Sequence, residues 1–159
     1  MNYIFVLFIA ISLKAYAEPV TQQNFLNISV EQEDCVFNYV RSIRVDKKSA
    51  LIQKPQVVYS HQIDLQTYQA EFQSLQGFLT DAFLNYFNNM TEKVFLYTGW
   101  DLYRGERTPL DSLAHEFTHF FQFVESGRDK DLQKNDSNDD LETEAVVVQT
   151  KFRDLKICR

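Results

Sequence analysis

Apolar residues recur at alternating steps of three and four in four segments of the chain, a spacing that places them on one face of a helix. The second segment is the longest, and we expect a kink where Gly77 interrupts it. The last segment begins at Asp139 or Asp140, either of which can cap it. The predicted helices cover Val30–Arg44, Leu65–Tyr86, 109–126 and about 140–156.

Three short segments rich in β-branched and aromatic residues predict strands at Ser49–Gln53, Gln56–Ser60 and Val94–Thr98. Lys54-Pro55 separates the first two, and Gly99 ends the third. Three short strands among about four helices predict an α+β fold, with one small three-stranded mixed sheet packed on the helices.

The composition restricts the classes of protein to which this chain can belong. A chain of 159 residues with 45% apolar residues is one domain with a single core. Its formal net charge of -6 gives no electrostatic support for nucleic-acid binding, so we expect no nucleic-acid partner. The sequence also lacks a nucleophile-elbow motif, a P-loop and a dinucleotide fingerprint.

The first seventeen residues resemble a cleavable signal peptide. Ile4 to Leu13 is an apolar stretch too short to span a bilayer, and Ala15-Tyr16-Ala17 offers a cleavage site. We therefore expect residues 1–17 to be removed after Ala17, leaving residues 18–159 as a single secreted or periplasmic domain without a stable membrane anchor.

Export changes the interpretation of the two cysteines. Cys35 and Cys158 are too far apart in sequence for a C-x-x-C zinc or redox motif. In an oxidising compartment such a pair favours a disulfide, which would tie an early helix to the C-terminus. Two buried free thiols are the alternative.

The helix predicted from Pro109 has clear signals at both ends. Thr108 is the expected N-cap, Pro109 occupies the first helical position, and Asp111 completes a capping-box pattern. Gly127 follows the last periodic residue as a C-terminal cap. This helix is therefore the best-defined element in the sequence.

The same helix carries the pentapeptide His115-Glu116-Phe117-Thr118-His119, an H-E-x-x-H motif. Residues four apart share a helical face, so both imidazoles can reach one Zn²⁺ ion while Glu116 serves as general base. The two histidines are predicted to lie nearly opposite the apolar stripe, which favours their interpretation as metal ligands over that as core residues. That stripe comprises Leu110, Leu113, Ala114, Phe117, Phe120, Phe121 and Val124.

A catalytic zinc ion usually has three protein ligands. His61 stands far from the motif, while Gln122 and Glu125 replace the glycine and histidine of a longer H-E-x-x-H-x-x-G-x-x-H pattern. A carboxylate of the acidic last helix is the better candidate. Its apolar periodicity favours Glu144 mildly over Glu142.

The motif, followed about 25 residues later by Glu144-Ala145 opening a helix, resembles the gluzincin metallopeptidases of the thermolysin type, and the small size is similar to that of single-domain minigluzincins. The resemblance covers about residues 94–156. It implies that His115, His119 and Glu144 bind zinc and that Glu116 activates water. It also implies that Val94–Thr98 is an edge strand binding an extended substrate.

The sequence departs from that group at two points. Val148 stands where those peptidases often carry an aspartate that orients a ligand histidine, so such support must come from elsewhere. No residue is assigned by motif as donor to the transition-state oxyanion, and Tyr97 and Tyr103 are the candidates near the expected cleft.

These features predict an exported zinc metallopeptidase that hydrolyses peptide bonds in a peptide or protein substrate. One alternative is an exported zinc-binding protein without hydrolytic activity. A further alternative is an exported interaction protein whose motif is accidental and whose aromatic residues, including 14 Phe and 8 Tyr, supply an interface.

Overall fold

The computed structural model describes residues 25–44, 52–131 and 138–159, and it confirms the predicted α+β class. Four helices accompany one three-stranded mixed sheet in these ranges. In chain order the elements are α1 (Val30–Arg44), β1 (Gln56–Tyr59), the 3-10 turn η1 (Ser60–Gln62), α2 (Leu65–Gln76), β2 (Tyr86–Asn88), β3 (Lys93–Leu96), α3 (Pro109–Glu125) and α4 (Asn138–Leu155).

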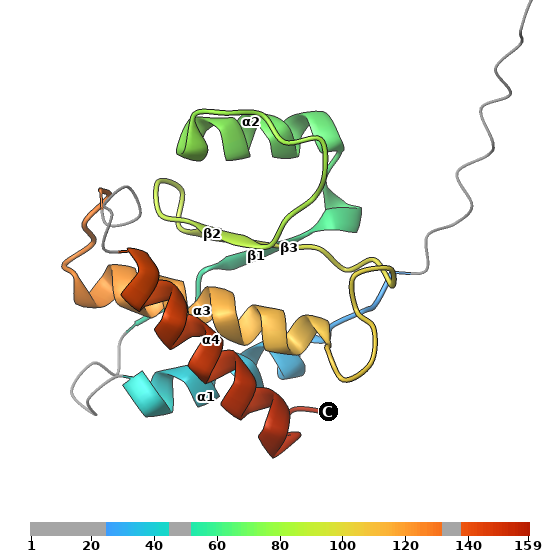
Figure 1. The fold of residues 1–159 in the computed structure, drawn as a ribbon, viewed down its shortest axis with the longest axis vertical. Coiled ribbons are helices and arrows are strands. Elements are labelled where there is room, and N and C mark those ends of the chain that lie inside the picture. The colour runs from blue at the N-terminus through green and yellow to red at the C-terminus, as the bar shows by residue number, and fades with distance from the viewer. Residues whose placement is uncertain (1–24, 45–51, 132–137) are drawn as a thin grey trace, which may run out of the picture.

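The sheet separates one helix from the other three (Figure 1). Its strand order is β1-β3-β2, with β1 parallel and β2 antiparallel to the central strand β3. Helix α2 covers one face, whereas α3 packs against the other face and is itself covered by α1 and α4. The motif helix therefore lies at the centre of the molecule.

Alternation along β3 divides the core in two. Val94 and Leu96 face α3 and belong to the larger cluster, which also includes apolar residues of α1 and α4. Phe95 points to the opposite face, where it stacks on Tyr86 and contacts Tyr68 of α2. Both faces of this short sheet are thus buried, which holds β2 firmly against the motif helix.

Local sequence signals set both ends of α3. The Thr108 side chain accepts a hydrogen bond from the backbone N–H of Asp111, and Asp111 accepts one from the Thr108 backbone N–H. A cap of this kind contributes about 1 kcal/mol. Gly127, with φ at 77°, follows the end of the helix in the left-handed conformation that glycine adopts readily.

The prediction of one long helix over 65–86 is wrong. Helix α2 ends at Gln76, and Gly77 terminates it with a left-handed φ of 77° rather than kinking it. Tyr86 continues the helical spacing in the sequence but lies in β2. Its ring stacks on Phe95 with centroids 4.7 Å apart, a contact between strands that a local pattern does not reveal.

Two of the three predicted strands are present in the structure. Gln56–Ser60 and Val94–Thr98 correspond to β1 and β3, with slightly different ends. Of the predicted strand Ser49–Gln53, residues 49–51 lie outside the described part, and the described Ile52 and Gln53 form no strand. Strand β2 takes its place as the third member of the sheet.

The predicted disulfide between Cys35 and Cys158 is confirmed, with the two Cα atoms 5.7 Å apart. It links α1 to the end of the chain across 123 positions. In the chain-entropy model, closing a loop of this length stabilises the fold by roughly 4–5 kcal/mol.

The predicted signal peptide, residues 1–17, lies outside the described residues. Among the described helices, none combines the length and apolar character required to cross a membrane.

Candidate metal centre

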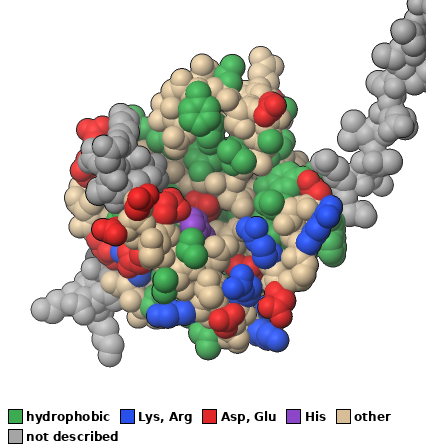
Figure 2. All heavy atoms as spheres, in the orientation of Figure 1, with side chains coloured by type: hydrophobic (Ala, Val, Ile, Leu, Met, Phe, Trp, Pro, Cys, Tyr) green, Lys and Arg blue, Asp and Glu red, His purple; other side chains and the backbone are tan. Residues whose placement is uncertain are grey.

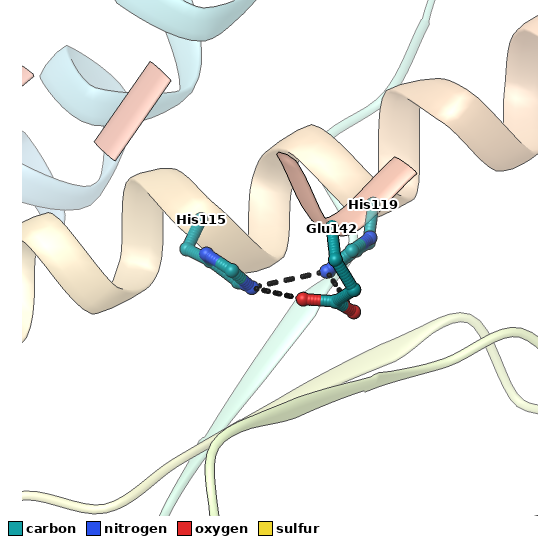
Figure 3. A group of neighbouring side chains, drawn as sticks. All are labelled: His115, His119 and Glu142. Atoms are coloured by element: carbon teal, nitrogen blue, oxygen red, sulfur yellow. Dashed lines mark hydrogen bonds and ion pairs between the residues drawn. The ribbon is translucent and has the colours of Figure 1, made fainter. Parts of the chain in front are cut away.

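His115 and His119 project from consecutive turns of α3 toward each other (Figure 3). Their Nε2 atoms are 3.1 Å apart, and the ring centroids are separated by 4.8 Å. His119 is 8% exposed because β2 and α4 cover this side of the helix, so the face opposite the apolar stripe is also enclosed. The two imidazoles thus present nitrogen lone pairs to one shared position.

Glu142, in the first turns of α4, completes the group (Figure 3). One carboxylate oxygen lies 3.1 Å from Nε2 of His119, and the other lies 3.4 Å from Nε2 of His115. Tetrahedral ligands with bonds of about 2.0–2.1 Å are about 3.3 Å apart, close to these separations. The three side chains can therefore hold a metal ion.

Glu144, the third ligand expected from the sequence, lies elsewhere. Its carboxylate forms an ion pair with Arg44 and accepts a hydrogen bond of 3.1 Å from Nε2 of Gln122. Residues that are two positions apart in a helix are separated by about 200° around its axis. Glu142 and Glu144 therefore lie on opposite sides of the apolar stripe of α4. Because of the way α4 crosses α3, the side of α4 that carries Glu142 faces the histidines. The sequence pattern of a single helix does not reveal that crossing.

Gln122 supports His119 from within the same helix. Its Nε2 donates to the carbonyl oxygen of Leu141 at 2.9 Å as well as to Glu144, so its Oε1 is the atom that faces His119. Oε1 lies 2.8 Å from Nδ1 of His119 and accepts a hydrogen bond from it. This contact fixes the tautomer in which the Nε2 lone pair is free for a metal. This role of Gln122 was not predicted from the sequence, although a polar residue three positions after a ligand, on the same helical face, is a usable signal.

Glu116 is buried, with 5% of its surface exposed, and it lines a cavity of about 220 Å³ together with the three candidate ligands. Burial raises the pKa of its carboxyl group to about 7. His119 and a backbone hydrogen bond from Phe87 oppose that rise, while the negative charge of Glu142 adds to it. A carboxylate with a pKa near neutrality is suited to accept and return a proton.

The histidines differ in their titration. Burial, followed by the charge of His119, lowers the pKa of His115 to about 4, so this ring is neutral at physiological pH. Burial also acts to lower the pKa of His119, but the hydrogen bond to Glu142 and the charges of Glu116 and Glu142 outweigh it, and the pKa is raised. The pKa of Glu142 is lowered, chiefly by its bond to His119.

The other candidate ligands do not join this group. His61 contacts Oγ1 of Thr98 through Nδ1 at 3.1 Å and stacks on Tyr59. Glu125 pairs with Arg44 at 2.5 Å.

The two candidate oxyanion donors already have hydrogen-bond partners. The hydroxyl of Tyr103 donates to the carbonyl oxygen of Tyr97 at 2.6 Å. The hydroxyl of Tyr97 donates to Asp101 at 2.5 Å. Neither proton is free in this conformation to stabilise an oxyanion beside His115.

The expectation that Val94–Thr98 forms an edge strand is wrong, because β3 is the central strand of the sheet. Strands β1 and β2 occupy the two edges, and residues Tyr86 and Phe87 of β2 line the cavity with the histidines. The space-filling view shows histidine in a hollow, with acidic side chains gathered on its left and a mixture of basic and acidic side chains on its right (Figure 2).

Comparison of the chain with protein-family models, with curated proteins and with solved structures finds no match in any of the three.

Proposed function

We propose that the protein is an exported zinc-dependent peptidase. One observation carries the proposal: two histidines and Glu142 converge on a common position in a cavity that the buried Glu116 also lines. The motif resemblance to gluzincin peptidases supports it, with Glu142 in the place that the sequence analysis gave to Glu144. The disulfide supports export, because such bonds persist in oxidising compartments.

The donor set favours zinc among the common metals. Two imidazole nitrogens and one carboxylate oxygen form the ligand group of many catalytic zinc sites, which leave a fourth position open. Zinc bound there supplies Lewis-acid polarisation of water and of a peptide carbonyl group. Gln122 holds the ring of His119 in the tautomer that such binding requires.

Glu116 performs the proton transfers in this proposal. Its carboxylate takes a proton from the attacking water as the oxygen bonds to the peptide carbonyl carbon. It then gives that proton to the amide nitrogen as the C–N bond breaks, so the products are a carboxylic acid and an amine. A pKa of about 7 allows both transfers near neutral pH.

Strand β2 is the element best placed to align a substrate. It is an edge strand, and its residues Tyr86 and Phe87 border the cavity next to the candidate ligands. An extended peptide that adds to a sheet edge receives backbone hydrogen bonds, and on β2 it would compete with Glu116 for the backbone hydrogen bond of Phe87. We place the scissile bond beside His115 and Glu116, because these residues line the same cavity as Tyr86 and Phe87.

The test measures zinc content and peptide cleavage in the same preparation of the mature chain. The proposal requires one equivalent of zinc, cleavage of a peptide library, and loss of both in a His119→Ala variant. Absence of zinc from the folded protein, or cleavage that persists after the metal is removed, would contradict it.

A zinc-binding protein without hydrolytic activity is the second candidate. The engaged hydroxyl groups of Tyr97 and Tyr103 favour it, because neither of these two protons is free to stabilise an oxyanion. One equivalent of zinc, unfolding on chelation and no cleavage across the library would support this candidate over the first.

A further inference from the structure

A second cavity, of about 140 Å³, lies beside the candidate metal centre. It shares three lining residues with the first cavity, so the two adjoin each other across the same surface of α3. The six residues that line it are Asn85, Arg107, Ser112, His115, Glu116 and Gln149. A single water needs about 10–15 Å³, so this space has room for a side chain of several non-hydrogen atoms.

The lining of this cavity is polar throughout, and Arg107 is its only permanent cation. Arg107 is exposed, and it forms no ion pair or hydrogen bond with any residue in the described ranges. Asn85 and Gln149 also line the cavity, but the amide of Asn85 is already engaged, because it accepts a hydrogen bond from the backbone N–H of Tyr97 and donates one to the hydroxyl of Tyr103. A guanidinium group that no described residue pairs is thus positioned next to the residues proposed above to cleave the peptide bond.

We propose that this cavity is a substrate subsite that binds a carboxylate next to the scissile bond. An apolar side chain there would cover the guanidinium group of Arg107 without pairing it, which is unfavourable. A basic side chain would meet the charge of Arg107. A carboxylate instead accepts charge-assisted hydrogen bonds from Arg107, which the planar guanidinium favours geometrically. The inference rests on the proposed peptidase activity and names its substrate class.

The carboxylate has two possible sources in a peptide, an acidic side chain or the C-terminus. Matched peptides that carry Glu, Gln, Lys or Leu on either side of the bond test the first source. Pairs with a free or an amidated C-terminus test the second. For the true source, we expect kcat/KM to exceed that of the uncharged partner by about tenfold or more, as one charge-assisted hydrogen bond provides.

Variants of Arg107 assign the preference to this side chain. Arg107→Gln should bring the ratio for the charged and uncharged peptides close to one, and Arg107→Glu should favour the Lys peptide. Arg104→Gln removes an arginine from the same loop that does not line the cavity, so it should leave the ratio unchanged. A carboxylate preference that survives in Arg107→Gln, or a preference for Leu in the wild type, would overturn the proposal.

A binding experiment separates failure of the subsite from failure of the peptidase. The Glu116→Gln variant is titrated with the same peptides by calorimetry, with and without the Arg107→Gln change. Carboxylate-selective binding that depends on Arg107 supports the subsite even if no preparation cleaves peptide. Cleavage without selectivity, accompanied by equal binding of the charged and uncharged peptides, would contradict the subsite proposal but not the proposed peptidase activity.

Discussion

Gln122 Oε1 accepts a hydrogen bond of 2.8 Å from Nδ1 of His119, within a single turn of α3. The same side chain donates to the carbonyl oxygen of Leu141 and to Glu144, so it also connects the motif helix to α4. One residue therefore fixes the tautomer of a candidate ligand and the position of the helix that carries Glu142. This arrangement replaces the aspartate that is missing at Val148.

Substitution of Gln122 by Leu should weaken zinc binding about 10–100-fold, the usual effect of removing a partner of a metal-bound histidine. The measurement is competition for zinc against a chromophoric chelator. Gln73→Leu, on the exposed side of α2, is the control and should bind zinc as the wild type does. Equal affinities for Gln122→Leu and the wild type would show that His119 needs no such support.

Glu142→Ala should reduce zinc affinity more than Gln122→Leu does, because it removes a candidate ligand rather than a supporting contact. Glu144→Ala should retain a larger share of the affinity, and it should lower the free energy of unfolding by about 1 kcal/mol at most, since the Glu144 side chain is 47% exposed. The same chelator competition, with urea unfolding alongside, compares the two. The reverse order of zinc affinities would restore Glu144 as the ligand.

Zinc affinity should fall about tenfold for each unit of pH between about pH 6.5 and pH 5. His119, whose pKa is raised above its ordinary 6.5, must lose one proton to bind zinc, whereas His115, with a pKa of about 4, is already neutral. The titration uses Glu116→Gln, so that the carboxyl group with a pKa of about 7 releases no further proton. A slope of two protons would mean that His115 also binds a proton in this range.

The double variant Cys35→Ser, Cys158→Ser should lose roughly 2–5 kcal/mol of unfolding free energy, because the unfolded chain regains the freedom of a long loop. Urea unfolding under oxidising conditions measures the difference. The wild type in reductant should show a similar loss, whereas the double variant should be insensitive to reductant. A loss below about 1 kcal/mol would mean that packing alone holds α1 against the C-terminus.

Features encoded by neighbouring residues were predictable from the sequence. The helix α3 follows from Thr108, Pro109 and the apolar stripe, all of which act within one segment. Features that depend on distant contacts were not. Tyr86 fits a helical spacing with the preceding residues, yet its stacking on Phe95 places it in β2.

The third member of the metal group shows the same limit. Periodicity identified the acidic start of α4, and both glutamates stood close to the borders of its apolar stripe. The choice between Glu142 and Glu144 depends on how α4 crosses α3 and on the ion pair that Arg44 of α1 forms with Glu144. Both are tertiary relationships that no single segment contains.

The most direct test of the peptidase proposal compares Glu116→Gln with the wild type at equal zinc content. The proposal predicts one equivalent of zinc in both proteins and a loss of about 10²–10⁴-fold in the rate of peptide hydrolysis for the variant, because the general base is removed. Undiminished hydrolysis by the zinc-loaded variant would contradict the assignment of Glu116 and the mechanism built on it.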